Sequence, residues 1–303
     1  MTWNGAQLLP ACLDAVVPEG AAVLVVDNAS VDGTAELLAR DYPSVQVTRL
    51  PTNTGFAGGV AHALELVTTP YVVLLNNDAV VRPGWLAALL APLEADPRVA
   101  AVCSKLLLPD GRLNSAGGYV TEIGYAHDLG FGQPDDGSWD TAAEVAFATG
   151  TAAAFRCSAV QEVGGVDPRY FLYVEDVDLS WRLRLAGWSL RYEPTAVVVH
   201  QHSASAGEGS LLHTFHTERN RLATLVTNAT AGTAIRAVLR YPLTTISVAL
   251  GESRAKARVR VRAFWSFLRW LPVLLGRRRQ VTLVRSRAAV EARFAELRDP
   301  AGR

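Results

Sequence analysis

Apolar runs and helical patterns alternate along the first third of the chain. The apolar runs cover residues 22–27, 45–50 and 71–75, and the helical patterns cover residues 35–40, 60–68 and 83–94. A continuous apolar run bounded by turn residues is typical of a strand that is buried on both faces of a parallel sheet. Strand–helix alternation at this spacing predicts an α/β fold with an open, mostly parallel sheet.

Polar side chains follow each predicted strand, at Asp27, at Asn53 and at residues 76–78 (Asn-Asn-Asp). In open α/β sheets, ligands bind beyond the carboxyl ends of the strands, where these side chains would gather. Each cluster also has a simpler interpretation, because Asp27 could cap the next helix and Asn-Asn-Asp could be a polar strand end. Residues 55–59 hold three glycines without the GxGxxG spacing, which excludes a dinucleotide site of the Rossmann type.

The segment 170–184 holds three acids within four residues, at Glu175, Asp176 and Asp178. Such a cluster is costly unless a cation or a proton offsets the repulsion. The pattern becomes helical from Asp176, which places that carboxylate at the positive end of a helix, a setting suited to a general base. The alternative is an acidic cap on an ordinary amphipathic helix.

Two histidines, His200 and His202, end an apolar strand over residues 197–203. Alternation puts them on one side of an extended chain, where one or both could bind a metal. Packed or solvated histidines are the alternative. A further helical pattern contains His213, His216 and residues 218–221.

Composition narrows the class of protein. Half of the 303 residues are hydrophobic, which is enough for a large core and excludes a disordered chain. The cysteines Cys12, Cys103 and Cys157 are far apart, which indicates a reducing compartment and argues against a cysteine metal site. No signal peptide is visible at the N-terminus.

Charge is distributed unevenly between two regions. Residues 1–228 carry 13 basic and 25 acidic residues, whereas residues 229–303 carry 16 and 4. The basic region includes an arginine–aromatic run over residues 254–279 that is too short and too charged to span a bilayer. This region predicts a helical tail that associates with an anionic membrane surface, or one that packs on the core. No recognition motif supports nucleic-acid binding.

Taken together, these segments resemble the family 2 glycosyltransferases with the GT-A fold, in particular their rhamnosyltransferase-like branch. The resemblance covers roughly residues 2–225. Its motifs are TWNG (2–5), VVDNASVDGT (25–34), NTGFAGG (53–59), LLNNDAVV (74–81), ATG (148–150), GGVD and YFLYVEDVDLSWRLRLAGW (164–188), the histidine strand and ERNRL (218–222). Their joint occurrence in this order is highly specific.

The resemblance implies a role for each matching residue. Asp176 corresponds to the catalytic base, and Asp78 with His200 corresponds to the site of a divalent metal, Mg²⁺ or Mn²⁺. Glu175 and Trp181 are expected to lie beside the acceptor. The residues expected to bind the nucleotide and diphosphate of the donor are Asn4, Asp27, Asn53, Asn76, Asn77, Arg219 and Asn220.

The chain departs from the family pattern at three places. The motif at residues 76–78 has a single acid, Asp78, and Ala61 and His62 stand where the family has an asparagine. The family also has a hydrophobic strand before TWNG, whereas here Met1 precedes Thr2 directly. Loss of that strand would leave buried backbone groups unpaired, so we expect the coding sequence to begin upstream, with an in-frame strand.

The sequence therefore predicts a GT-A domain over residues 1–228, its first strand apparently missing, and a basic helical, membrane-associating tail over residues 229–303. The predicted activity is inverting transfer of a sugar, rhamnose being one candidate, from a nucleotide-diphosphate sugar to a glycan or lipid-linked acceptor. It would serve cell-envelope or polysaccharide synthesis at the cytoplasmic face of the membrane. A sugar-nucleotide nucleotidyltransferase and a non-catalytic glycan- or membrane-binding scaffold are the alternatives.

Overall fold

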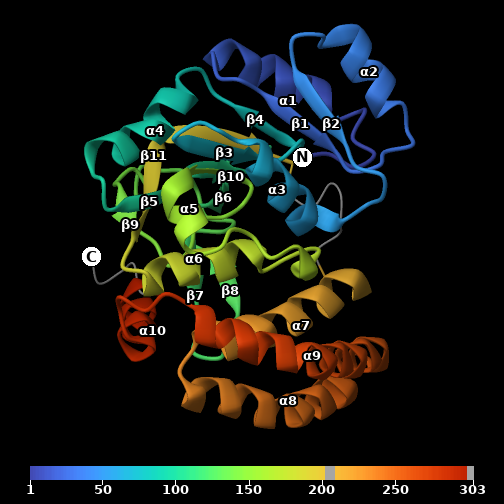
Figure 1. Ribbon diagram of the computed structural model, residues 1–303, viewed down its shortest axis with the longest axis vertical. Coiled ribbons are helices and arrows are strands. Elements are labelled where there is room, and N and C mark those ends of the chain that lie inside the picture. The colour runs from blue at the N-terminus through green and yellow to red at the C-terminus, as the bar shows by residue number, and fades with distance from the viewer. Residues whose placement is uncertain (202–208, 299–303) are drawn as a thin grey trace.

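A computed structural model describes residues 1–201 and 209–298. Figure 1 shows an α/β part in which helices flank a central sheet, with four helices from the last third of the chain gathered below it. The predicted α/β fold class is confirmed, and so is the helical C-terminal region.

The N-terminal elements form a small parallel pair of strands covered by helices. They are α1 (Leu9–Val16), a 3-10 turn (Val17–Glu19), β1 (Leu24–Asp27), α2 (Thr34–Asp41) and β2 (Gln46–Arg49). Leu9, Leu13, Val25 and Leu38 form their common core. β1, β2 and α2 lie within two residues of the ranges predicted from the sequence, because each is a short segment with strong local signals. Helix α1 was not predicted.

The main sheet has the strand order β3-β10-β5-β11-β4, with β6 added beside β5 and β9 beside β11. Its strands are β3 (Tyr71–Leu75), β4 (Ala79–Val81), β5 (Val99–Leu107), β6 (Leu113–Ser115), β9 (Ala143–Glu144), β10 (Ala152–Arg156) and β11 (Ser189–His200). Every residue of β5 is buried, so this strand is the centre of the fold.

The strand directions differ from the mostly parallel sheet that we expected. Among the strand pairs of the described residues, β1–β2 and β5–β11 are parallel, whereas β3–β10, β10–β5, β5–β6, β11–β4 and β11–β9 are antiparallel. The cause is the long excursion over residues 108–151. It returns the chain so that β10 enters the sheet between β3 and β5 in the opposite direction.

Side chains of the main sheet alternate between two cores. Val102, Ala152 and Ala154 face α4 (Trp85–Ala95), where Trp85 and Leu89 are buried. The neighbouring positions face the larger core, which is covered by α3 (Gly55–Leu66), α5 (Cys157–Glu162), the 3-10 turn Pro168–Tyr170 and α6 (Glu175–Leu185). The hairpin of β7 (Gly118–Val120) and β8 (Ala126–Asp128) lies on the same side.

The last four helices share this larger core. They are α7 (Leu211–Asn228), α8 (Ala231–Gly251), α9 (Arg254–Gln280) and α10 (Arg287–Leu297). Tyr241, Phe267, Leu274 and Phe294 belong to the same buried cluster as the sheet residues. The predicted boundary between residues 228 and 229 stays a prediction, but the helices on its two sides are packed together. Over residues 1–201 and 209–298, no helix is long and apolar enough to cross a membrane.

Thr2 lies beside β1, with its N–H donating to the Val26 carbonyl at 2.9 Å and its own carbonyl accepting from Asn28. Within the described residues, β1 has ladder partners in β2 and Thr2, and β3 has one in β10. The two sheets are therefore separate. The upstream strand expected from the sequence stays a prediction.

A buried charge cluster joins the C-terminal helices. The carboxylate of Glu218 on α7 accepts hydrogen bonds from Tyr125 Oη at 2.8 Å, from Arg221 Nη2 at 2.9 Å and from Arg260 Nη1 on α9. Both guanidinium groups are buried, and Arg260 also donates to Thr244 and Thr245 of α8. One carboxylate thus offsets two buried cations.

We expect Glu218→Gln to lower the free energy of unfolding by about 3–5 kcal/mol, because it leaves Arg221 and Arg260 buried without a counter-charge. Urea unfolding followed by circular dichroism measures the change. The matched control is Glu252→Gln, which removes an exposed carboxylate 3.6 Å from Lys256 and should cost about 0–1 kcal/mol. Equal losses in the two variants would contradict the proposed role of the cluster.

Candidate functional site

Asp27 ends β1 and its side chain is completely buried. One carboxylate oxygen accepts the N–H of Ser30 at 2.9 Å, so Asp27 closes the turn rather than capping α2, which begins at Thr34. Among the described residues, no donor reaches the other oxygen, Oδ2, which lies 3.6 Å from Nε of Arg49. A buried carboxylate oxygen is thus available to a hydrogen-bond donor of a ligand.

Asparagine side chains tie the neighbouring loops together. Asn4 has a left-handed backbone (φ 50°), and its Oδ1 accepts the N–H of Val31 at 2.8 Å. Asn28 Nδ2 donates to Asn53 Oδ1 at 2.9 Å and to the Gly55 carbonyl at 3.0 Å. The structure therefore brings the predicted residues Asn4, Asp27 and Asn53 into one loop cluster. Asn28 was missed as the link, although it stands in the VVDN segment.

Residues 76–78 connect β3 to β4 and hold their position through backbone and side-chain bonds. The N–H of Asn76 donates to the Thr151 carbonyl at 2.8 Å, and Asn77 Nδ2 donates to Thr2 Oγ1 at 2.9 Å. Asp78 follows, with its carbonyl accepting from Gln201 at 3.0 Å. This last bond fixes Asp78 beside the end of β11.

Asp78 and His200 meet because β4 and β11 are antiparallel, with His200 paired to Ala79. Nε2 of His200 lies 3.3 Å from Oδ1 of Asp78, and both side chains are buried. On the other side of the ring, Nδ1 lies 2.6 Å from Oδ1 of Asn114. An amide oxygen only accepts, so the Nδ1–H tautomer is favoured, and the Nε2 lone pair then faces Asp78.

This pair fits a divalent cation. No described residue donates a hydrogen bond to the buried Oδ1 of Asp78, and a cation bound beside His200 would satisfy that oxygen. A carboxylate and a neutral imidazole oriented by a second hydrogen bond are ligands of Mn²⁺-type sites. In the part of the chain that the structure describes, no group of three or more His, Cys, Asp or Glu side chains forms a metal site. His202, the other predicted candidate, lies outside the described residues.

Asp176 lies in the first turn of α6, as its sequence pattern predicted. Its Oδ2 accepts the N–H of Gly150 at 2.9 Å, and its Oδ1 accepts the N–H of Val177 at 2.8 Å. Burial raises the pKa of Asp176, whereas these two backbone donors oppose the rise. The carboxylate is thus held in a fixed orientation at the positive end of a helix.

The two neighbouring acids differ from Asp176. Burial and the adjacent Asp176 raise the pKa of Glu175 to about 8, which favours its protonated form. Burial opposes ionisation of Asp178 too, but Arg182 and Arg277 hold its pKa below the ordinary value. Arg182 Nη2 and Arg277 Nη2 lie 2.8 and 3.2 Å from Asp178 Oδ2. Asp176 therefore differs from Asp178 in that backbone N–H groups, rather than guanidinium groups, hold its carboxylate.

The loop before α6 is strained. Phe171, Tyr173 and Val174 all have positive φ, between 65° and 71°, a conformation that non-glycine residues rarely adopt. Asn220 Nδ2 lies 2.7–3.0 Å from the carbonyls of Tyr170, Leu172 and Tyr173. Arg219 Nη2 donates to the Tyr170 carbonyl at 2.8 Å. These two predicted donor-binding residues thus hold the loop that positions Asp176.

The first residue of α3, Gly55, has to be a glycine. Its φ is 72°, and a Cβ there would lie 2.1 Å from the Phe171 carbonyl oxygen. The start of α3 therefore packs directly against the strained loop, and the Ala57 N–H donates to the same carbonyl at 3.1 Å. A side chain at position 55 would push the two segments apart.

Trp181 does not lie where the predicted acceptor contact requires it. Its side chain is 2% exposed and packs edge-on against Phe294 of α10, at 4.8 Å between ring centroids. An indole enclosed in the core cannot contact an acceptor, so Trp181 is corrected to a packing residue. The error arises because Trp181 falls on the buried face of α6.

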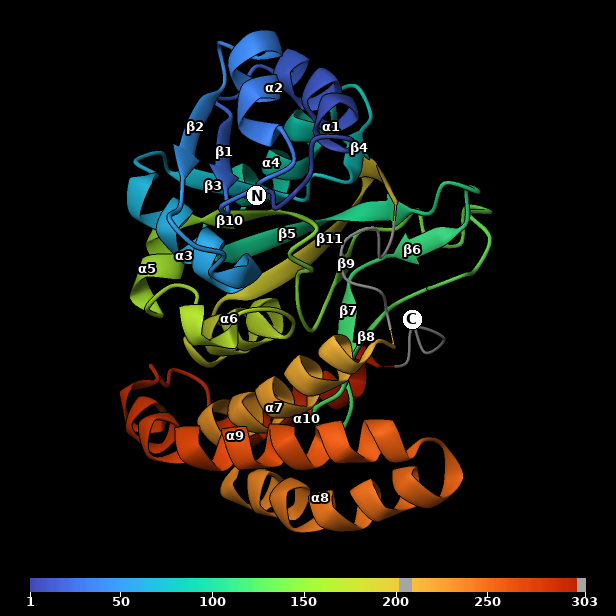
Figure 2. The same ribbon diagram turned by 90° about the vertical axis from the view of Figure 1, so that its right-hand side faces the viewer.

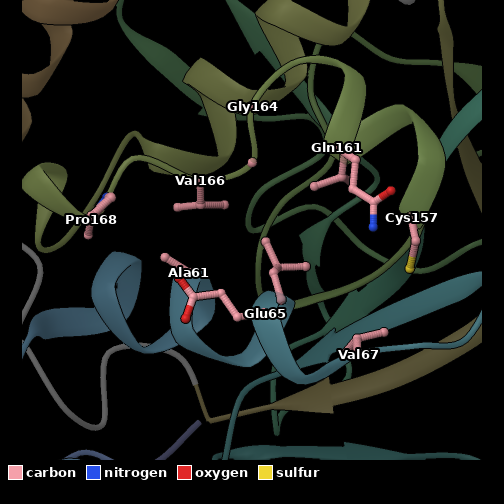
Figure 3. A pocket seen from close by; sticks show the side chains of 11 residues that line it. Ala61, Glu65, Val67, Cys157, Gln161, Gly164, Val166 and Pro168 are labelled. Atoms are coloured by element: carbon pink, nitrogen blue, oxygen red, sulfur yellow. The ribbon is translucent and has the colours of Figure 1, made fainter.

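Figure 3 shows a hollow between α3 and α5. Its lining is largely apolar and includes Leu64, Val67, Val160 and Val166. Of the described residues, those that line it include none of the predicted site residues. The predicted site residues therefore lie outside the lining of this hollow.

Comparison with known proteins gives three kinds of similarity. The model of the family described as "Glycosyl transferase family 2" matches residues 1–164, just over half of the chain. The N-acetylglucosaminyl-diphospho-decaprenol L-rhamnosyltransferase of Mycobacterium tuberculosis is 31% identical over 215 residues, which are 63% of this chain and 70% of that protein. The pre-mycofactocin glycosyltransferase of the same species is 35% identical over 189 residues, 60% of this chain and 38% of that protein.

Solved structures share the fold. GalNAc-T7, crystallised with UDP, GalNAc and Mn²⁺, aligns with a TM-score of 0.62 at 16% identity, over 88% of this chain and 54% of that one. The mannosyltransferase PcManGT from Pyrobaculum calidifontis, in complex with GDP-Man and Mn²⁺, aligns with a TM-score of 0.53 at 18% identity, over 98% and 86%. The predicted GT-A fold is thereby confirmed.

The raised pKa of Glu175 makes the stability of the fold depend on pH. Its raised pKa stabilises the protein fully below the ordinary value of 4.5, and this contribution is lost as pH rises to about 8. Glu175→Gln mimics the protonated form and removes the dependence. We expect the variant to gain stability relative to the native chain by up to about 1 kcal/mol per pH unit across this window.

Thermal melts of both proteins at pH 5, 6, 7 and 8 measure this difference. Glu162→Gln, in an exposed hydrogen bond to Trp188 Nε1 at 2.9 Å, is the control and should show no such trend. A constant difference between native and Glu175→Gln proteins would show that Glu175 is ionised throughout.

Proposed function

The chain belongs to glycosyl transferase family 2, and from this we propose that it transfers a sugar from a nucleotide-diphosphate sugar to an acceptor hydroxyl, with inversion. The observation that carries the proposal is the setting of Asp176. It is a half-buried carboxylate held by two backbone N–H groups at a helix start, next to an acid whose pKa is raised and near an acid paired with arginines. A residue of this kind is suited to act as a general base.

In the proposed reaction, the acceptor hydroxyl transfers its proton to the carboxylate of Asp176. The acceptor oxygen forms a bond to the anomeric carbon as the bond from that carbon to the diphosphate oxygen breaks. The nucleoside diphosphate leaves from the opposite face. A single displacement inverts the anomeric configuration, and the fixed orientation of Asp176 keeps the base aimed at the hydroxyl.

The donor is proposed to lie along the strand ends. Oδ2 of Asp27 accepts a hydrogen bond from the nucleotide base, with Asn4 and Asn53 shaping the surrounding loops. Asn76 and Asn77 lie between this cluster and the proposed metal pair. Arg219 and Asn220 act through the loop that they hold, and Glu175 is proposed to lie beside the acceptor without transferring a proton.

Asp78 and His200 would hold Mg²⁺ or Mn²⁺, with Asn114 orienting the imidazole. A divalent cation bound there supplies charge neutralisation for the departing diphosphate. The remaining positions around the ion would be taken by donor oxygens and water, since the ligands of such hard cations are mostly oxygen.

The similarity to a rhamnosyltransferase whose name specifies a diphospho-decaprenol acceptor favours a deoxyhexose donor and a lipid-linked acceptor in envelope synthesis. We propose that the reaction takes place at the cytoplasmic face of the membrane. Membership of the family argues against a nucleotidyltransferase, and the retained Asp78, Asp176 and His200 argue against a scaffold. A screen of dTDP-rhamnose, UDP-N-acetylglucosamine and GDP-mannose for donor hydrolysis tests the proposal.

We expect Asp176→Asn to lower the turnover number about 10²–10⁴-fold, because the amide cannot accept the acceptor proton. Donor binding, measured by calorimetry, should change little, since Asp176 does not contact the nucleotide in this proposal. Asp110→Asn, in a surface pair with Arg112, is the matched control and should keep full turnover. A variant with more than half of the native turnover would remove Asp176 from the reaction.

Transfer should stop after treatment with EDTA and return when Mn²⁺ or Mg²⁺ is added. Asn114→Leu should weaken Mn²⁺ binding about 10–100-fold, because it removes the hydrogen bond that orients His200. Electron paramagnetic resonance of Mn²⁺ with protein and UDP measures this affinity without turnover. Full activity of metal-free protein, or an unchanged affinity in a normally melting variant, would argue against the site.

A further inference from the structure

Helix α8 carries a continuous aliphatic stripe on its outer side. Figure 2 shows α8 at the end of the molecule farthest from α1 and α2, beyond α9. Five large side chains lie at spacings of three or four residues and are therefore on one face. Their exposed fractions are 57% for Ile235, 70% for Leu239, 67% for Leu243, 56% for Ile246 and 85% for Leu250. We call these five residues the α8 stripe.

The opposite face of α8 already accounts for its packing. Ala237, Tyr241 and Thr245 are buried, and the Tyr241 ring stacks on Phe264 of α9 at 5.1 Å between centroids. The α8 stripe is therefore not needed to hold the helix on the protein. An exposed apolar row of this length marks an interaction surface.

The charged side chains within α8 have one sign, and the acids Glu252 and Glu291 lie at its two ends. Arg236 and Arg240 are exposed on α8 itself, and neither α8 nor α9 contains an Asp or Glu residue. The exposed residues of α9 include Trp265 and arginines, of which Arg262 and Arg269 line a hollow with Trp265 and Phe215 of α7. An aliphatic row with arginines on the same helix, here Arg236 and Arg240, is the pattern of a helix that lies in the interface of an anionic membrane.

We propose that the α8 stripe inserts between the acyl chains of an anionic bilayer, with Arg236 and Arg240 at the level of the lipid phosphates. The helix then lies parallel to the membrane and buries its outer face about 5–10 Å deep. The enclosed face keeps its contacts with α9, so the protein docks without unfolding.

Electrostatics favours a lipid surface over a second copy of the chain. Pairing two α8 stripes would bring two copies of acid-free, arginine-bearing helices together, and like charges at a contact oppose association. An anionic lipid surface instead attracts each of these arginines. The partner proposed is therefore the membrane, and self-association is an outcome of the test.

The proposed membrane contact lies on α8, whereas the sequence indicated the arginine–aromatic run over residues 254–279. Three arginines of that run point inward. Arg260 pairs with Glu218, Arg277 pairs with Asp167 and Asp178, and Arg278 donates to the carbonyls of Val226 and Ala229. Those cations stabilise the fold and cannot also contact lipid. The apolar contact comes from α8.

Co-sedimentation with vesicles of phosphatidylglycerol and phosphatidylcholine tests the proposal with the full chain and without donor. Its result is thus independent of the transfer reaction. The native protein should bind vesicles with 40% phosphatidylglycerol. Leu239→Gln with Leu243→Gln should bind about 100-fold more weakly, since each lost aliphatic contact weakens binding about tenfold. Glutamine has nearly the helix propensity of leucine, so the melting temperature should be unchanged.

Leu66→Gln, which replaces a half-exposed leucine at the end of α3, is the control and should bind like the native protein. Arg236→Gln with Arg240→Gln should lose the preference for phosphatidylglycerol over pure phosphatidylcholine vesicles. Native protein that does not bind anionic vesicles would overturn the proposal. So would an unchanged leucine double variant, or a sedimentation dimer that the leucine substitutions dissociate.

Discussion

Three carboxylates within four residues, at the start of α6, set the constraint on which the site depends. Like charges so close together cannot all be buried and ionised. Each carboxylate has different surroundings. Asp178 is paired with guanidinium groups, the raised pKa of Glu175 favours its protonated form, and Asp176 is held by backbone N–H groups. The result is one carboxylate, Asp176, that backbone donors hold in a fixed place. Neutralising all three with arginines would leave no base, and protonating all three would leave no acceptor for the proton.

The cations that hold Asp178 link the tail to the site. Arg182 comes from α6 itself, but Arg277 comes from α9, 99 residues after Asp178 in the chain. Arg277 also pairs with Asp167 at 2.7 Å. The basic C-terminal region is therefore part of the support of the proposed base. It has two chemically distinct sides, an inner one where arginines meet buried acids and an outer one formed by the α8 stripe. The basic residues of this region, which form one run in the sequence, are therefore divided between the inner side and the outer side.

Local sequence patterns predicted those helices and strands whose formation depends mainly on neighbouring residues. β3 has the bounds expected from its apolar run, and α4 begins at Trp85, because strand and helix signals there are strong. The direction of β10 was not predictable, since it depends on how the chain returns after residues 108–151. Asn114, which orients His200, lies in that stretch and has no local signal. Trp181 was assigned to the acceptor because its position in α6 did not reveal that α10 covers it.

The strained loop explains why separate motifs belong together. Backbone strain at Phe171, Tyr173 and Val174 costs about 1–3 kcal/mol per residue, a sum comparable to the 5–15 kcal/mol that stabilises a domain. The loop persists because Asn220 and Arg219 bind its carbonyls and because Gly55 lets α3 approach Phe171. Residues near positions 55, 171 and 220 therefore form one hydrogen-bonded unit behind Asp176. A change in any one of them shifts the base, so the three motifs constrain one another although none of these residues needs to touch the substrate.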